Sequence, residues 1–285
     1  MRALYSPPTK RQAASLCRKS TACLTLSWAM AIFLSANAIS LQAAEQLTKS
    51  EEGQIYDQAI HILGGNANVV SKWVDDIHFA IIGEATEESG RLAQSTLAGI
   101  ARQTGLSLLP VEHTFANAKD YLAAVEQTPP FQSAACSADN SDHCANFVVI
   151  FTDATTMFAM TKAIPLRPVY QKSMEDHHDI PCFFAPFQTR AMEISQAFVY
   201  VRQDLPQAMI RTCLQEEIYQ SFGLFNDFSG STFFSFNNIV EPKSITLYDR
   251  ALLASVYDAQ IKPGAPVWRV MEQLMEKLNI DPFSK

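Results

Sequence analysis

The stretch Cys213-Leu-Gln-Glu-Glu-Ile-Tyr-Gln-Ser-Phe-Gly-Leu-Phe-Asn-Asp227 is the most informative part of this 285-residue sequence. It covers the end of a helix that we expect over about 205–222, because apolar residues recur there at every fourth position. Gly223 follows, and glycine allows a sharp backbone turn that other residues resist. The adjacent acids Glu216 and Glu217 are therefore expected on a helix that ends in a tight turn.

The spacing of this stretch resembles the extended zinc-protease motif HExxHxxGxxH/D. In that motif, two His residues one helical turn apart bind one metal, and the Glu activates a zinc-bound water. The three ligand positions are occupied here by Glu216, Gln220 and Asn226, the last followed by Asp227. Glu217 stands at the position of the base, so the spacing is kept while the His ligands are replaced.

The sequence downstream extends this resemblance to the metzincin-type proteases, which place a Met-containing turn beneath the metal. The corresponding segment is 232–236, with Phe234 at the Met position, and Ile245-Thr-Leu-Tyr-Asp249 resembles their next helix start. A bacterial family of exported zincin-like proteins of unknown function is still more similar. Its EExxQxxGLxxD, Phe-Asn and YDxxxKPG segments correspond here to 216–227, 236–237 and 257–264.

The resemblance implies an α+β, zincin-like fold, with a mixed sheet packed on helices, a motif-bearing helix and a C-terminal helical part. It is strong over the last third of the chain; in front it rests on element order and on Lys72-Trp73 before a strand. We expect no zinc or other cofactor, because a Gln amide is a poor zinc ligand and no His falls within the motif. Glu217 is then a vestigial base, and Glu216, Gln220 and Asp227 are expected to form a hydrogen-bond network.

The function expected from this degenerate site is binding or scaffolding by a pseudo-metallopeptidase of the cell envelope. Zincins hold peptides along an edge strand beside the motif helix, so the expected partner is a peptide or an envelope protein. Nucleic acid is not expected, because the formal net charge is −7. One alternative is a hydrolase in which Glu217 is the base and Glu216 and Asp227 hold a harder metal or act as an acid/base pair. Another is a purely structural envelope component.

The N-terminal segment 1–44 has the pattern of a signal peptide. It carries basic residues and no acid, then an apolar run over 24–34, then small residues that predict cleavage near Ala38 or Ala43/Ala44. The protein is therefore expected to be periplasmic or secreted, and the alternative is a retained N-terminal membrane anchor. The remainder, 45–285, is expected to form one domain, with a sheet-and-helix part over about 45–204 and a helical part over about 205–285.

Four cysteines follow the signal segment, an even number that suggests disulfides in an exported protein. Cys136 and Cys144 flank a polar loop and are expected to pair, which leaves Cys182 and Cys213 as a second pair or as two buried thiols. The adjacent His177 and His178 are assigned to a solvated loop. The phenylalanines at 225–236 are interpreted as packing residues, with a ligand surface as the alternative.

Periodicity predicts the remaining elements. Strands are expected at 76–83, 106–111, 146–153 and 194–201, and helices at 51–63, 89–104, 121–125, 246–257 and 266–278. The proline-containing stretch 165–186 is expected to be loop-like.

Overall fold

The computed structural model describes residues 47–64, 68–111, 117–127, 145–163, 180–228, 230–236 and 245–280. The chain divides into two compact units, Met1–Gln46 and Leu47–Lys285, and every described residue belongs to the second. The predicted signal segment, Cys136, Cys144, His177, His178 and Asn237 lie outside the described residues.

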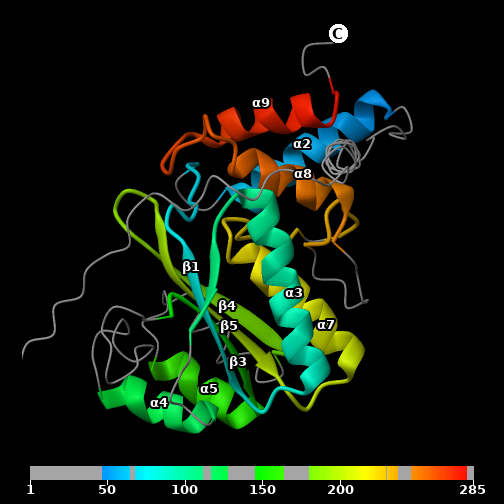
Figure 1. Cartoon of the computed structure of the whole chain (residues 1–285). Coiled ribbons are helices and arrows are strands. Elements are labelled where there is room, and N and C mark those ends of the chain that lie inside the picture. Colours follow the sequence, from blue (N-terminus) through cyan, green and yellow to red (C-terminus); the bar gives the residue numbers. More distant parts are fainter. Residues whose placement is uncertain are drawn as a thin grey trace, which may run out of the picture. The chain divides into compact units, whose positions relative to one another are not determined.

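In the described part of the chain, five strands form one mixed sheet in the order β2-β1-β3-β5-β4 (Figure 1). The strands are β1 (Ile77–Gly83), β2 (Leu108–Pro110), β3 (Phe147–Thr152), β4 (Cys182–Gln188) and β5 (Ile194–Arg202). The first four in the sheet order are parallel, whereas β4 runs antiparallel to β5 at the edge. Every residue of β3 is buried, as expected for a central strand of a parallel sheet.

Helices cover both faces of the sheet, because alternate residues of β3 enter two separate apolar clusters. One face packs against α3 (Glu87–Thr104) and α7 (Gln207–Gln220), and the other packs against α4 (Ala118–Gln127) and α5 (Ala154–Ala163). Figure 1 shows α4 and α5 together at one side of the sheet, with α3 and α7 at the other. The described unit is therefore α+β with helices on both sides of a mixed sheet.

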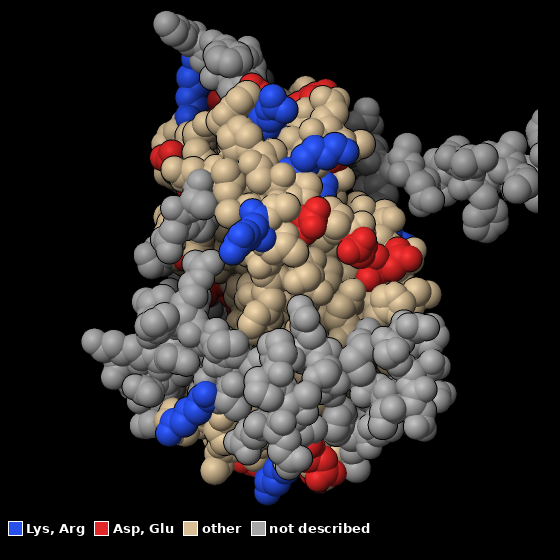
Figure 2. Space-filling view, turned by 90° about the vertical axis from the view of Figure 1, so that its left-hand side faces the viewer, with Lys and Arg blue, Asp and Glu red and all other residues tan. Residues whose placement is uncertain are grey.

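Three further helices enlarge the cluster that contains α3 and α7. They are α2 (Lys49–Leu63), α8 (Leu247–Val256) and α9 (Val267–Lys277), and α9 contacts both α2 and α8. Among the described residues, none of the helices has the length and apolar character needed to span a bilayer. In Figure 2, the described Lys and Arg side chains on one face lie interspersed with Asp and Glu side chains.

Most predicted elements are confirmed to within a few residues, and the motif helix is α7. The loop-like interpretation of 165–186 is wrong at its end, because 182–188 forms β4. Pro186 argued against a strand, but an edge strand tolerates a residue without an N–H. The sequence analysis missed α5, because Asp153, whose carboxylate accepts from the Thr156 N–H ahead of this helix, was assigned to the end of a strand. It also made α4 too short.

Candidate functional site

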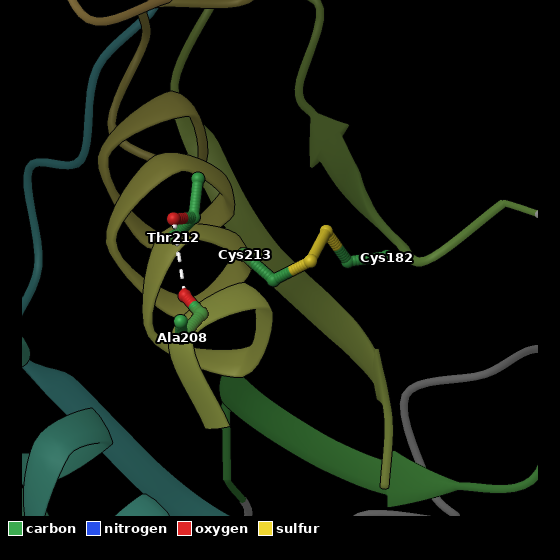
Figure 3. Close-up of a disulfide and its surroundings, with 4 residues drawn as sticks. All are labelled: Cys182, Ala208, Thr212 and Cys213. Atoms are coloured by element: carbon green, nitrogen blue, oxygen red, sulfur yellow. Dashed lines mark hydrogen bonds between the residues drawn. A yellow bond between two sulfur atoms is a disulfide. The ribbon is translucent and has the colours of Figure 1, made fainter. Parts of the chain in front are cut away.

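A disulfide between Cys182 and Cys213 joins the edge strand β4 to the motif helix α7 (Figure 3). It confirms the second cysteine pair and removes the alternative of two buried thiols. In the same turn of α7, the Thr212 hydroxyl donates to the Ala208 carbonyl at 3.2 Å (Figure 3). The first half of the motif is therefore held covalently beside the edge of the sheet.

The turn after α7 packs tightly against the segment that precedes β1. Gly223 has a φ of +105°, and a Cβ atom there would lie 2.3 Å from the backbone oxygen of Ser71. The Trp73 indole N–H donates to the Ser221 carbonyl at 3.0 Å, which satisfies one of the free carbonyls at the helix end. Glycine is thus required at position 223 both by the backbone conformation and by the space available.

Glu217, at the position of the zincin base, is buried with 8 % of its surface exposed. Burial raises its pKa well above the usual value, and the neighbouring carboxyls of Glu216 and Asp227 raise it further. Both effects disfavour a negative charge, because the surroundings solvate it poorly and already contain acids. The protonated form of Glu217 is therefore favoured.

The side chains of Glu216, Gln220 and Asp227 meet, as the sequence predicted for these three positions. The Gln220 amide donates to one carboxyl oxygen of Asp227, and Glu216 also hydrogen-bonds to the Asp227 side chain. Partial burial raises the pKa of Asp227, while these two bonds act in the opposite direction. An ionised carboxylate can only accept, so two hydrogen-bonded carboxyls share at least one proton.

His61, near the end of α2, is a site residue that the sequence reading missed. Its Nε2 atom lies 2.9 Å from the Asp227 backbone oxygen, and its own backbone oxygen accepts from the Asn226 amide at 2.9 Å. The Asn226 backbone N–H donates to the Ile62 carbonyl at 3.2 Å. Asn226, at the third ligand position, is thus bound to α2, and no spacing in the sequence indicates this contact across 165 residues.

The segment that corresponds to the Met turn is held by two buried polar side chains. The Gln58 side-chain oxygen accepts from the Thr232 hydroxyl at 2.8 Å and from the Phe233 N–H at 3.0 Å. The Asp249 carboxylate accepts from the Ser235 N–H at 3.0 Å and takes part in the capping box of α8. Phe234 is buried in the core between these anchors, which supports the packing interpretation for this residue.

The residues at the motif do not suit zinc. Zinc sites in proteins are built mainly from imidazole and thiolate, whereas this cluster offers carboxyl groups and a Gln amide that is engaged with Asp227. Within the described ranges, no group of three or more His, Cys, Asp or Glu side chains is arranged to hold a metal ion.

A search of curated proteins and a search of solved structures found no match to this chain. The family described as "Protein of unknown function (DUF2927)" matches residues 50–276, a range that contains the motif helix α7 and the edge strand β4. The chain belongs to this family of unknown function.

Proposed function

We propose that this protein is an exported, zincin-like binding protein of the cell envelope that holds an extended peptide segment beside α7 and does not cleave it. The observation that carries the proposal is the closed network at the motif. Glu216 and Gln220, at two of the positions where zincins bind metal, both hydrogen-bond to the Asp227 side chain. The Cys182–Cys213 disulfide supports export, because such bonds persist in oxidising compartments.

The state of Glu217 argues against a hydrolytic mechanism. A general base must be ionised and must reach the water that it deprotonates. Glu217 is buried, and burial together with its acidic neighbours raises its pKa. The alternative in which Glu217 is an active base has no supporting contact in the described residues.

The edge strand β4 offers a binding surface beside the motif helix. It pairs with β5 along one side and is tied to α7 by the disulfide. Phe184 of β4 stacks on Phe225 after α7, with ring centroids 6.2 Å apart and planes 12° apart. Among the described residues, β4 pairs only with β5, so an extended peptide would add to its other side by backbone hydrogen bonds and place side chains against these rings.

A photo-crosslinker incorporated at Phe184 in living cells tests the binding surface. Benzoylphenylalanine suits this site, because Phe184 is already aromatic and only half-buried. Trp268 on α9, which is 51 % exposed, is the matched control position. We expect a discrete crosslinked adduct from Phe184 and none from Trp268. Equal labelling at both positions, or none at Phe184, would count against the proposal.

The absence of cleavage is tested with purified protein and a panel of peptides. We expect no turnover, and the same result for Glu217→Gln. Peptide hydrolysis that disappears in Glu217→Gln would establish the hydrolase alternative instead.

A further inference from the structure

A pocket of about 340 Å³ lies at the carboxyl ends of the parallel strands. Its lining includes Gly83 at the end of β1, Thr152 at the end of β3 and Gln203 just after β5. The motif turn is at the other end of these strands, where Phe222 packs on Phe147 at the start of β3 with ring centroids 5.7 Å apart. The pocket is therefore separate from the motif site.

The connections of the sheet explain why a pocket forms at this point. From β1 the chain passes through α3 to β2, and from β3 it passes through α5 toward strands on the opposite side of the sheet. The helices α3 and α5 pack on opposite faces of the sheet. The direction in which the chain adds strands therefore reverses between the neighbouring strands β1 and β3. Open α/β sheets hold ligands in the crevice at such a reversal of strand order, outside the carboxyl ends.

Backbone hydrogen bonding joins two strand ends beside the pocket. Thr152, at the end of β3, is 3 % exposed, and its backbone oxygen accepts from the Gln203 N–H at 3.0 Å. Both residues belong to the lining, so the ends of β3 and β5 are held together at this site.

The walls of the pocket carry opposite charges. Lys119 lies in the first turn of α4, and its positive charge favours a carboxylate at this wall. The Asp120 N–H of the same turn donates to the Asn117 side chain, which also belongs to the lining. Glu84 and Asp153 are also part of the lining and favour a cation. The Asp153 pKa is lowered, first by the hydrogen bond from the Thr156 backbone, so this carboxylate is charged at neutral pH.

We infer that this pocket binds a free amino acid. Lys119 would hold its carboxylate, and Glu84 and Asp153 would hold its ammonium group. The volume is at the lower end of the range for small-molecule sites, which runs from roughly 300 to 1,000 Å³, and therefore suits a ligand of this size.

Calorimetric titration of the purified protein with each common L-amino acid in turn tests this inference. We expect saturable binding of at least one of them. Its N-acetyl derivative, which lacks the ammonium group, and its amide, which lacks the carboxylate, should each bind about tenfold more weakly or not at all.

The variants Lys119→Gln and Glu84→Gln should weaken binding by a similar factor, because each removes one charge from the lining. Lys162→Gln on α5 and Glu272→Gln on α9 are matched controls outside the lining, and they should leave the affinity unchanged. Thermal unfolding confirms that each variant is folded.

Several outcomes would overturn the inference. They are the absence of binding by every amino acid at millimolar concentration, equal binding of the blocked derivatives, and binding that the lining variants do not change. Saturable binding of glucose in place of amino acids would assign the pocket to neutral polyols. None of these outcomes affects the crosslinking result at β4.

Discussion

At the residue scale, two positions at the end of α7 are constrained by different physical effects. Glu217 is constrained by charge, because burial and two neighbouring acids disfavour its ionised form. Gly223 is constrained by space and by backbone conformation, because it has a positive φ and lies against Ser71. Neither constraint depends on a metal ion, so both can be measured as effects on stability.

Glu217→Gln should stabilise the protein increasingly as the pH rises. Because the folded-state pKa of Glu217 is raised above 4.5, its contribution to stability is complete below that pH and is lost as the pH rises through the folded-state value. The neutral amide has no such dependence. Chemical unfolding across this range should therefore give curves that diverge above about pH 4.5. Exposed Glu272→Gln is the control, and parallel curves for Glu217→Gln and wild type would contradict the prediction.

Gly223→Ala should lower the free energy of unfolding by about 3 kcal/mol, from backbone strain and the contact with the Ser71 oxygen. Gly53→Ala in α2 is the matched control, because a Cβ there meets no atom within 4 Å. It should stabilise the protein by about 0.5–1 kcal/mol. Urea unfolding of the two variants provides the measurement, and similar effects from both would refute this account of Gly223.

At the element scale, side chains from distant segments hold the helices of the motif region. The N-terminus of α8 is held by Asp249, which also binds the Ser235 N–H. Its C-terminus is held by the buried Lys72, whose ammonium group donates to the carbonyls of Val256 at 3.1 Å and Ile261 at 2.9 Å. A cation at this end also complements the helix dipole. The Cys182–Cys213 disulfide holds α7 against β4 in the same way, by a covalent bond.

Replacement of both Cys182 and Cys213 by Ala should lower the free energy of unfolding by about 3 kcal/mol. The bond closes a loop between residues 31 apart, and its loss releases the unfolded chain from that restraint. Thermal unfolding with and without a reducing agent provides the measurement. Reductant should destabilise wild type to the level of the double variant and leave the variant unchanged. A wild type that is insensitive to reductant under unfolding conditions would refute the prediction.

At the scale of the whole molecule, one sheet separates two sites of different character. The motif network lies beside the face covered by α3 and α7, whereas the pocket lies at the carboxyl ends of the strands, where α4 begins. Parallel strands make this separation possible, because their carboxyl ends all lie at the same end of the sheet, opposite the end that contacts the motif turn. A ligand at either site would stabilise the folded chain in proportion to its occupancy.

Zinc should not change the thermal unfolding midpoint of the purified protein, and neither should removal of metals with EDTA. A metal that binds only the folded state, present at a free concentration 100 times its dissociation constant, would stabilise the folded protein by about 2.7 kcal/mol. Differential scanning fluorimetry readily detects a change of this size. Glu216→Ala serves as the control for binding at the motif. A midpoint that falls in EDTA, returns with zinc and does so only when Glu216 is present would contradict the prediction.

Local patterns in the sequence predicted most of the helices and strands, because apolar periodicity reports directly which face of an element is buried. The Cys182–Cys213 pair and a helix start at 245–249 were also predicted, whereas the capping box of α8 was seen only in the structure. The edge strand β4 was not, because Pro186 is a loop signal unless the strand is known to lie at the edge. The sequence could predict that Glu216, Gln220 and Asp227 meet, because the first two lie one turn apart on a helix and the third follows in the next turn.

The sequence by itself determined most of the elements, the glycine turn at Gly223 and the replacement of the His ligands, because these depend on residue type and local spacing. Only the tertiary structure decided that Glu217 is buried beside two acids, that His61 reaches the Asp227 backbone and that a pocket forms between the ends of β1 and β3. Burial, charge proximity and cavities arise from segments far apart in the chain. No local pattern encodes them, because they depend on which elements pack together.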